Sequence, residues 1–225
     1  PVDDAPVLAT NTGLTLNEGA TATIATTNLS ASDVDTTTGN LIYTVTGTTA
    51  NGRLELSSAP GVAITSFTQA DLAANKVKYV HNGSETTTDS FTFTLKDATT
   101  TLASASFSIT VTPVDDAPVL ATNTGVTVLE GATATIATTN LSATDADTAA
   151  GSLVYTVTGT PANGQLELST APGVAITSFT QADLAANKVK YVHNGGETTS
   201  DSFTFTLKDA TTTLAASTFN ITVTP

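Results

Sequence analysis

Ser90-Phe91-Thr92-Phe93-Thr94-Leu95-Lys96 places Phe91, Phe93 and Leu95 at every second position, with threonines between them. Because successive side chains of a β-strand point to opposite faces, this period of two predicts a strand with one buried and one solvated face. Threonine suits the solvated face, since it is both β-branched and polar. The same alternation returns at residues 202–208. The segment therefore indicates a β-protein built from half-buried strands.

Short strands are predicted on both sides of this segment, separated by turns. Asn51-Gly52 and Asn82-Gly83 are turn signals. The one helical segment is predicted near residues 68–74, where Thr68 can cap a helix with Asp71 three positions on. About seven strands in roughly 110 residues are typical of a Greek-key β-sandwich, so the predicted fold class is all-β. The remaining predicted strands are residues 14–16, 20–24, 41–46, 54–56, 77–81 and 107–111.

The whole sequence pattern occurs twice in the chain. A shift of 112 residues superimposes residues 1–112 on 113–224 without a gap, with 18 differences and 94 identities. We therefore predict two tandem cadherin- or immunoglobulin-like sandwiches, residues 1–112 and 113–225, with a joint at 112–118. Pro113 and Pro118 bracket this joint and favour a short, taut connector. Near-identity of neighbours indicates recent duplication, as in long repetitive arrays.

The composition narrows the possible partners. The 225 residues carry 20 acids against 7 bases, a formal net charge of -13. Nucleic acid and anionic membrane surfaces are poor partners for such a chain, and metal cations or basic surfaces are better ones. The absence of cysteine excludes disulfides and thiolate metal sites. No apolar run is long enough for a membrane span, and no signal peptide is evident. The chain also lacks methionine, even at its start, so we expect a piece of a longer protein.

Paired aspartates suggest a metal site. Asp33 and Asp35 in the first copy, and Asp145 and Asp147 in the second, are two residues apart. In extended backbone such side chains point the same way and offer several oxygens to a hard cation such as Ca²⁺. Exposed loops also collect aspartates as turn formers. Further acids favour the metal, because acids gathered at strand ends repel one another without a cation: Glu18, Glu130, Asp97, Asp209, Asp115 and Asp116.

Several motifs recur in both copies in the same order. In the second copy they are Asp-Asp-Ala-Pro-Val-Leu, Leu-Ser-Ala-Thr-Asp-Ala-Asp, Ala-Asn-Gly-Gln-Leu, Phe-Thr-Gln-Ala-Asp-Leu, Lys-Tyr-Val-His-Asn-Gly and Asp-Ser-Phe-Thr-Phe-Thr-Leu-Lys-Asp. In this order and spacing the unit resembles a cadherin-type repeat. It is more similar to the cadherin-like repeats of chondroitin-sulphate proteoglycans and of giant repetitive bacterial adhesins of the RTX type. The resemblance covers essentially the whole chain.

The resemblance implies calcium held between neighbouring repeats. The linker departs from the cadherin pattern at Thr112, Val114 and Asp116, and only Glu85 stands near the missing basal motif. We therefore expect about one or two ions rather than the usual three. The implied ligands at the joint are Glu18, Asp115, Asp116, Asp145, Asp147 and Asp209. The implied half-sites, completed by repeats outside this sequence, are Asp3, Asp4, Asp33, Asp35 and Asp97 at one end, and Glu130 with Glu197 at the other.

Other candidate sites are weaker. His81 and His193 lie in predicted strands without a serine or cysteine nucleophile pattern, so a structural histidine is favoured over a catalytic base. Paired acids could hydrolyse glycosides, but the chain has no tryptophan to stack on a sugar. Four Asn-x-Ser/Thr sequons occur; such tripeptides are frequent by chance and carry no meaning in most bacteria. Their asparagines are Asn28, Asn82, Asn140 and Asn220.

These observations favour a structural function over an enzymatic one. We expect a calcium-stiffened extender segment of a large secreted or cell-surface bacterial adhesin, supporting cell adhesion or biofilm attachment. Its partners would be neighbouring repeats of the same chain. The alternative is a binding module in which the repeats themselves bind a glycan or a like repeat. The scarcity of exposed aromatic residues favours the extender.

Overall fold

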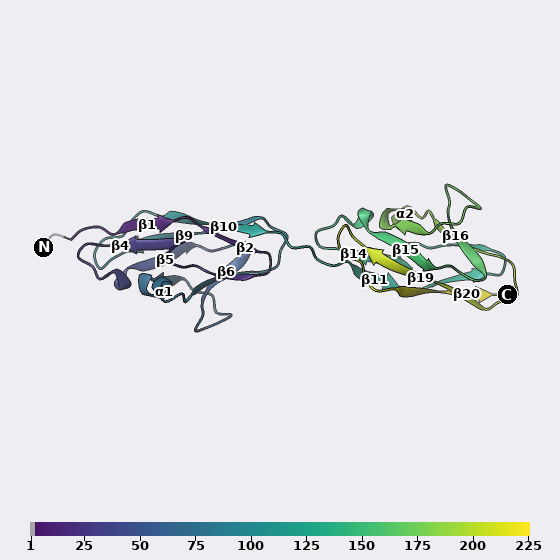
Figure 1. The fold of residues 1–225 in the computed structure, drawn as a ribbon, viewed down its shortest axis with the longest axis horizontal. Helices are drawn as coiled ribbons and strands as arrows, with labels where there is room; N and C mark the ends of the chain where they lie inside the picture. The colour runs from purple at the N-terminus through teal and green to yellow at the C-terminus, as the bar shows by residue number, and fades with distance from the viewer. Residues whose placement is uncertain (1–2) are drawn as a thin grey trace. The chain divides into compact units, whose positions relative to one another are not determined.

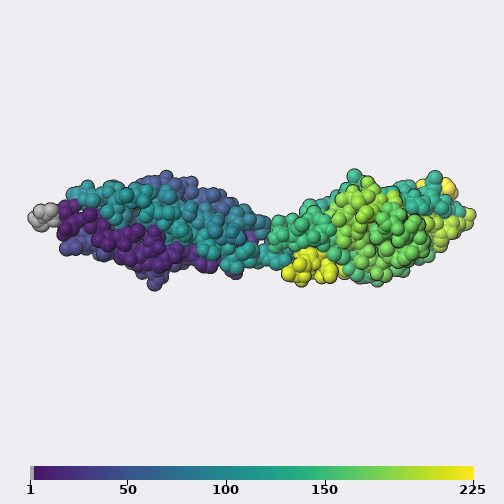
Figure 2. Space-filling view, turned by 90° about the horizontal axis from the view of Figure 1, so that it is seen from above, coloured from purple at the N-terminus to yellow at the C-terminus, as the bar shows by residue number. Residues whose placement is uncertain are grey.

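The computed structural model describes residues 3–225, and Pro1 and Val2 lie outside the described residues. The described chain forms two compact units, the first ending at Val114 and the second beginning at Asp115. Figure 1 shows each unit as a stack of strands, and Figure 2 shows the closely packed surface of each. Among residues 3–225, no helix has the length and apolar character needed to cross a bilayer.

The first unit is a β-sandwich of ten short strands in three sheets (Figure 1). A five-stranded sheet has the order β2-β10-β9-β5-β7, a three-stranded sheet the order β3-β8-β6, and β1 pairs with β4. The β2 and β10 strands run parallel, and every other pair is antiparallel. The strands are β1 (Val7–Asn11), β2 (Leu14–Asn17), β3 (Thr21–Thr23), β4 (Leu29–Ser32), β5 (Ile42–Gly47), β6 (Gly52–Leu56), β7 (Ser66–Thr68), β8 (Val77–His81), β9 (Thr88–Lys96) and β10 (Ala105–Thr112). The helical turns are η1 (Thr38–Asn40) and α1 (Gln69–Ala73).

The second unit repeats the same architecture, with sheets β12-β20-β19-β15-β17, β13-β18-β16 and β11-β14. Its pairing registers are those of the first unit moved by 112 residues, as Val126↔Ile221 against Leu14↔Ile109 illustrates. Its strands are β11 (Val119–Asn123), β12 (Val126–Leu129), β13 (Thr133–Thr135), β14 (Leu141–Thr144), β15 (Val154–Gly159), β16 (Gly164–Leu168), β17 (Ser178–Thr180), β18 (Val189–His193), β19 (Ser200–Lys208) and β20 (Ser217–Thr224). Its helical turns are η2 (Ala150–Ser152) and α2 (Gln181–Ala185).

Each unit buries its own core between the five-stranded and three-stranded sheets. In the first unit, Phe91, Phe93 and Leu95 all point inward from β9, as their alternation predicts. The Phe91 ring stacks on Phe107 of β10 with ring centroids 5.1 Å apart. Tyr79 of β8 contributes from the facing sheet and is fully buried. Aromatic pairs of this kind stabilise the sandwich beyond the area that they bury.

The seven segments predicted as strands all form strands. The structure adds three further strands in each unit, β1, β4 and β7 in the first and β11, β14 and β17 in the second. These three were not predicted because each is short and its burial depends on its pairing partner. The helical prediction is confirmed. The Thr68 hydroxyl accepts a hydrogen bond from the Asp71 amide, and the Asp71 carboxylate accepts one from the Thr68 amide.

Candidate metal site

Three loops of the first unit bring its aspartates together. Asp33 and Asp35 follow β4, Asp97 follows β9, and Asp3 precedes β1. Hydroxyl groups of Thr99 and Thr100 both donate to Asp3 Oδ2, the latter over 3.1 Å. The Asp4 amide donates to Asp35 Oδ2 at 3.2 Å, which ties the N-terminal segment to the loop after β4. We call Asp3, Asp4, Asp33, Asp35 and Asp97 the first aspartate cluster.

Backbone amides orient two of these carboxylates. Asp33 Oδ1 accepts from the amides of Asp35 (3.0 Å) and Thr36 (2.7 Å). Asp97 Oδ1 accepts from the amides of Thr99 (2.7 Å) and Thr100 (2.6 Å). In both residues the second oxygen, Oδ2, is buried and has no hydrogen-bond partner among residues 3–225. One oxygen of each carboxylate is therefore held in place while the other is left available.

The second unit builds the same arrangement from its own residues. Thr212 donates to Asp115 Oδ2 at 3.0 Å, and the Asp116 amide donates to Asp147 Oδ2 at 3.1 Å. Asp145 Oδ1 accepts from the Asp147 and Thr148 amides, and Asp209 Oδ1 from the Thr211 and Thr212 amides. Asp145 Oδ2 and Asp209 Oδ2 are again buried and without a partner in the described part of the chain. The second aspartate cluster is Asp115, Asp116, Asp145, Asp147 and Asp209.

These unpartnered oxygens fit a hard cation. A buried carboxylate oxygen without a hydrogen bond is costly, because it has lost water and gained no donor. Asp97 and Asp209 are each only 5% exposed, so water does not readily supply the missing bond. Calcium takes several carboxylate and carbonyl oxygens in flexible geometry. Each aspartate cluster therefore presents oxygen ligands of the kind that calcium requires.

The paired aspartates influence each other's ionisation. In the first cluster, the Thr36 amide lowers the pKa of Asp33. The Asp4 amide acts to lower the pKa of Asp35, but the Asp33 carboxyl and burial together raise it. In the second cluster, burial raises the pKa of Asp145, whereas the neighbouring Asp145 carboxyl and the Asp116 amide lower the pKa of Asp147. Either member can therefore hold the proton, and the stable feature is that two adjacent carboxylates resist ionising together.

Glu18, Glu85 and Glu130 are acidic residues at the other end of each unit. The Glu18 amide donates to Thr112 O at 2.9 Å, and its Oε2 accepts from the Val114 amide at 3.4 Å. A carboxylate oxygen of Glu85 lies within 4.8 Å of one from Glu18. The Glu130 amide makes the corresponding bond to Thr224 O at 2.8 Å. Hydrogen bonds and chain neighbours thus link ten of the predicted aspartates into two clusters, five in each unit.

His81 and His193 take structural positions. His81 is buried, and its Nδ1 accepts from the amides of Gly19 (3.1 Å) and Gly83 (3.2 Å). His193 Nδ1 accepts from the Gly131 and Gly195 amides in the same way. Each imidazole therefore fastens two turns together.

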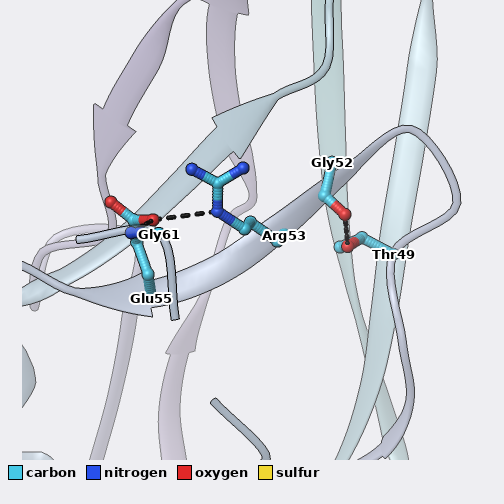
Figure 3. A network of polar contacts seen from close by, with 5 residues as sticks. All are labelled: Thr49, Gly52, Arg53, Glu55 and Gly61. Atoms are coloured by element: carbon cyan, nitrogen blue, oxygen red, sulfur yellow. Dashed lines mark hydrogen bonds and ion pairs between the residues drawn. The ribbon is translucent and has the colours of Figure 1, made fainter. Parts of the chain in front are cut away.

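Two further acidic residues, Asp89 and Glu55, have structural roles that were not predicted from the sequence. Asp89 accepts four hydrogen bonds, which outweigh burial and lower its pKa. Glu55 is buried in β6, and the Gly61 amide (2.8 Å) together with Arg53 Nε (3.0 Å) lowers its pKa against burial (Figure 3). Neither role was predicted, because one partner of each residue comes from a separate segment: the Gly61 amide for Glu55 and the Tyr79 hydroxyl for Asp89.

Arg53 also borders a small cavity in the first unit. The cavity has a volume of about 110 Å³ and a partly apolar lining that includes Val45, Leu54 and Ile64. In Figure 3 the Arg53 side chain extends from β6 toward Glu55, with its terminal nitrogens beyond the Nε that makes the bond. The second copy has Gln165 at this position. This is a difference between two otherwise closely similar surfaces.

Comparison with known proteins agrees with this architecture. The model of a family described as cadherin-like matches residues 6–111 and 118–223. The human extracellular matrix organizing protein FRAS1 is 42% identical over 209 residues, which are 92% of this chain and 5% of that protein. Human chondroitin sulfate proteoglycan 4 is 41% identical over 111 residues, which are 49% of this chain and 5% of that protein. The chain thus spans about one twentieth of the length of these relatives.

Solved structures show the same fold. Human mucin-like protocadherin EC1-2 superimposes with a TM-score of 0.54 and 13% identity, covering 98% of both chains. Human CDH23 EC21-23 superimposes with a TM-score of 0.53 and 17% identity, covering 98% of this chain and 70% of that one. Because these sequence identities are low, the similarity shows only that the chains share an arrangement of strands.

Proposed function

This chain belongs to the cadherin-like family, and on that premise we propose that it is a calcium-stiffened extender segment of a large extracellular adhesive protein. The observation that carries the proposal is the set of buried, unpartnered aspartate oxygens, Oδ2 of Asp33, Asp97, Asp145 and Asp209. They occur at equivalent positions of both copies. Their geometry suits a cation, and the net charge of -13 gives a cation a further reason to bind.

Asp145, Asp147 and Asp209, with Asp115 and Asp116, would hold calcium in the second copy; the corresponding first-copy residues would hold it there. A bound ion supplies positive charge where carboxylates otherwise repel. The chain's own contribution is orientation: backbone amides fix Asp145 and Asp209 through Oδ1. Hydrogen bonds alone join the three loops that carry these aspartates. A bound ion would hold the loops together more firmly. From the sequence we further propose that Glu18 contributes to the ion at the joint.

Calcium should raise the melting temperature of the chain. Extracellular calcium modules bind at about 10⁻⁴–10⁻³ M. Binding to the folded state alone at about 100 times Kd adds roughly 2.7 kcal/mol per site. The test compares calorimetric melting in EDTA and in millimolar calcium for the wild type and for Asp97→Asn with Asp209→Asn. This variant keeps the oxygen that accepts the two amides but removes the charge, so most of the calcium increment should disappear.

A matched control changes acids outside the clusters. Asp71→Asn with Asp183→Asn removes the same charge from the two helix caps, so its calcium increment should equal that of the wild type even if both melting temperatures fall. Equal melting of the wild type in EDTA and in calcium would overturn the proposal.

We place the chain outside the cell. The support is that its relatives are named as an extracellular matrix organizing protein and a proteoglycan. The finer setting, an RTX-type bacterial adhesin that serves biofilm attachment, is supported by the near-identity of the two copies, as in recently duplicated arrays. In that setting, deleting these repeats from the parent protein should reduce the attachment of cells to a surface, even though the part of the parent protein beyond the repeats is still displayed on the cell.

The alternative is that the repeats themselves bind a glycan or a like repeat. The cavity beside Arg53 is the observation that favours it, because an arginine next to a small apolar hollow can bind a carboxylate-bearing group. The test is a glycan array probed with each copy separately. Glycan binding by the first copy that is lost in Arg53→Gln would favour this function. If neither copy binds any glycan, this function is contradicted.

A further inference from the structure

The four sequon asparagines fall into two structural environments. Asn28 and Asn140 occupy equivalent positions in the two copies. Asn82 belongs to a sequon only in the first copy, because Gly196 replaces Ser84 in the second. Asn220 belongs to a sequon only in the second copy, where the first has Ser108. The pattern of possible modification therefore differs between otherwise similar repeats.

Asn28 and Asn140 use their side chains to hold a turn. Both are half-buried. Asn28 Oδ1 accepts from the Ala25 amide at 3.1 Å, while its Nδ2 donates to Gly13 O at 3.0 Å. Asn140 makes the corresponding bonds at 3.1 Å each. A sugar on Nδ2 needs an open path to solvent, which a half-buried nitrogen directed at a carbonyl does not offer.

Asn82 and Asn220 have exposed side chains with open nitrogens. Asn82 lies in the turn after β8, where its Oδ1 accepts from the Ser84 amide at 3.0 Å. Asn220 lies in β20 between the buried Phe219 and Ile221, so it faces solvent. Among residues 3–225, neither Nδ2 has a hydrogen-bond partner. A bulky, hydrophilic group on either nitrogen would extend into solvent without displacing a contact.

We propose that Asn82 and Asn220 are N-glycan attachment sites, and that Asn28 and Asn140 are not, when the chain is secreted through a pathway that glycosylates asparagine. The donor is an oligosaccharide linked to a lipid diphosphate. The asparagine Nδ2 forms a bond to C1 of the first sugar and loses one proton to a base of the transferase. The bond between C1 and the diphosphate oxygen breaks, and the lipid diphosphate leaves with the electron pair. The proposal rests on the extracellular placement proposed above, applies to a eukaryotic secretory pathway and not to the bacterial setting, and is independent of calcium.

The consequence is an asymmetric pair of repeats. The glycan on the second copy would cover the outward face of its five-stranded sheet beside β20, while the same face of the first copy stays bare. The glycan on the first copy would stand at the turn after β8 instead. Surface glycans are bulky and solubilising, so the two copies would offer different faces to any partner.

The test is site mapping on secreted protein. The chain is fused to a secretion signal, expressed in cultured human cells and analysed by peptide mass spectrometry before and after peptide N-glycosidase treatment. We expect two glycans per chain. Asn82→Gln and Asn220→Gln should each remove one glycan, and the double variant should show no mass shift on enzyme treatment. Asn28→Gln with Asn140→Gln should remove none.

The chain supplies matched gain-of-site controls. Gly196→Ser completes the sequon at Asn194, and Ser84 at the equivalent place shows that a serine fits. Ser108→Asn creates the sequon that the second copy has at Asn220. Each should add one glycan. Unmodified Asn82 and Asn220 in the secreted wild type, or glycans on Asn28 or Asn140, would overturn the proposal. Calcium melting of protein made in bacteria tests the proposed function separately.

Discussion

Hydrogen bonding distinguishes three uses of aspartate in each repeat. Asp33 has one saturated oxygen and one buried oxygen without a partner. Asp71 closes the capping box of α1. Asp89 has both oxygens saturated: Oδ1 accepts from the Ala50 and Ser90 amides, and Oδ2 accepts from the Asn51 amide and the Tyr79 hydroxyl. The available oxygen, rather than the charge, therefore distinguishes the proposed metal ligands from the other aspartates.

Replacing Asp89 should destabilise the first repeat. Asp89→Asn keeps the size of the side chain but offers only one acceptor oxygen, so at least two donors lose their partner. Hydrogen bonds to charged groups contribute about 1.5–3 kcal/mol each. We expect a loss of about 2–3 kcal/mol in the free energy of unfolding at pH 7, measured by urea denaturation of the first repeat. An unchanged midpoint would contradict the assigned role.

The effect of Asp89→Asn should depend on pH. The pKa of Asp89 is lowered in the folded state, so the folded form binds fewer protons than the unfolded form near pH 4. Its contribution is therefore fully present above the unfolded pKa of about 3.9 and is lost as the pH falls through the lower folded pKa. The stability gap between wild type and variant should be constant from pH 5 to 7 and narrow below about pH 4. A gap that widens in acid would contradict this assignment.

At this scale the sequence reveals part of the site. The spacing of Asp33 and Asp35 indicates that their side chains share a direction, and the structure places them in one cluster. It does not show that Thr99 and Thr100 hold Asp3, because that contact joins residues about 96 positions apart. Nor does it distinguish Asp89 from a turn-forming aspartate, since its Tyr79 partner comes from another sheet.

At the scale of elements, one glycine sets how closely β6 approaches β8. Gly52 stands opposite His81, and a Cβ atom there would meet Val80 O and come within 2.6 Å of the Tyr79 hydroxyl. Gly164 lies against Val192 and Tyr191 in the same way. No longer side chain fits, because the obstruction is partly backbone. The close approach lets Tyr79 extend its hydroxyl to Asp89.

Gly52→Ala should therefore disrupt the pairing of β6 with β8. Overpacking of this kind costs about 1–3 kcal/mol, and the loss should appear as a lower urea midpoint of the first repeat. Gly39→Ala is the matched control, because a Cβ there meets only Ala70 Cβ at an ordinary 3.5 Å. If both variants unfold at the same urea concentration, the tight contact at Gly52 does not limit stability.

Elements with a clear period were predictable, and those defined by their neighbours were not. β9 alternates over nine residues and β8 over five. Ser66–Thr68 is too short to show a period, and it is a strand because it pairs with β5. Val7–Asn11 has no fully buried residue, so its place beside β4 leaves little trace in the sequence.

At the scale of the molecule, each copy should fold alone. The two cores draw on separate residues, Leu16 to Val111 in one and Val128 to Val223 in the other. A sandwich of about 110 residues buries enough surface for independent stability. Residues 1–112 and 113–225 expressed separately should each give a β-type circular dichroism spectrum and a cooperative melt in calcium. A random-coil spectrum from either would show that the predicted boundary is wrong.

The second aspartate cluster should govern motion between the copies. Interfaces between domains of one chain permit relative motion by default, so we expect calcium to restrict it. Asp145→Ala with Asp147→Ala should leave both copies folded but broaden the distribution of distances between spin labels placed on each. The measurement is paired-label electron resonance in millimolar calcium. A distribution as narrow as that of the wild type would mean that the prolines of the linker alone set the stiffness.

The parallel pairing of β2 with β10 has a mechanical consequence. Leu14 to Asn17 lie beside Ile109 to Thr112 in parallel register. Once a pull on the N-terminal end has passed through β1, it draws β2 toward its start, while the pull on the other end draws β10 toward its end; these directions are opposite in parallel strands. The hydrogen bonds of this ladder are then loaded together in shear instead of opening one after another. Rupture of this ladder under tension thus requires all its hydrogen bonds to break together, so the repeat resists force where its second strand meets its last.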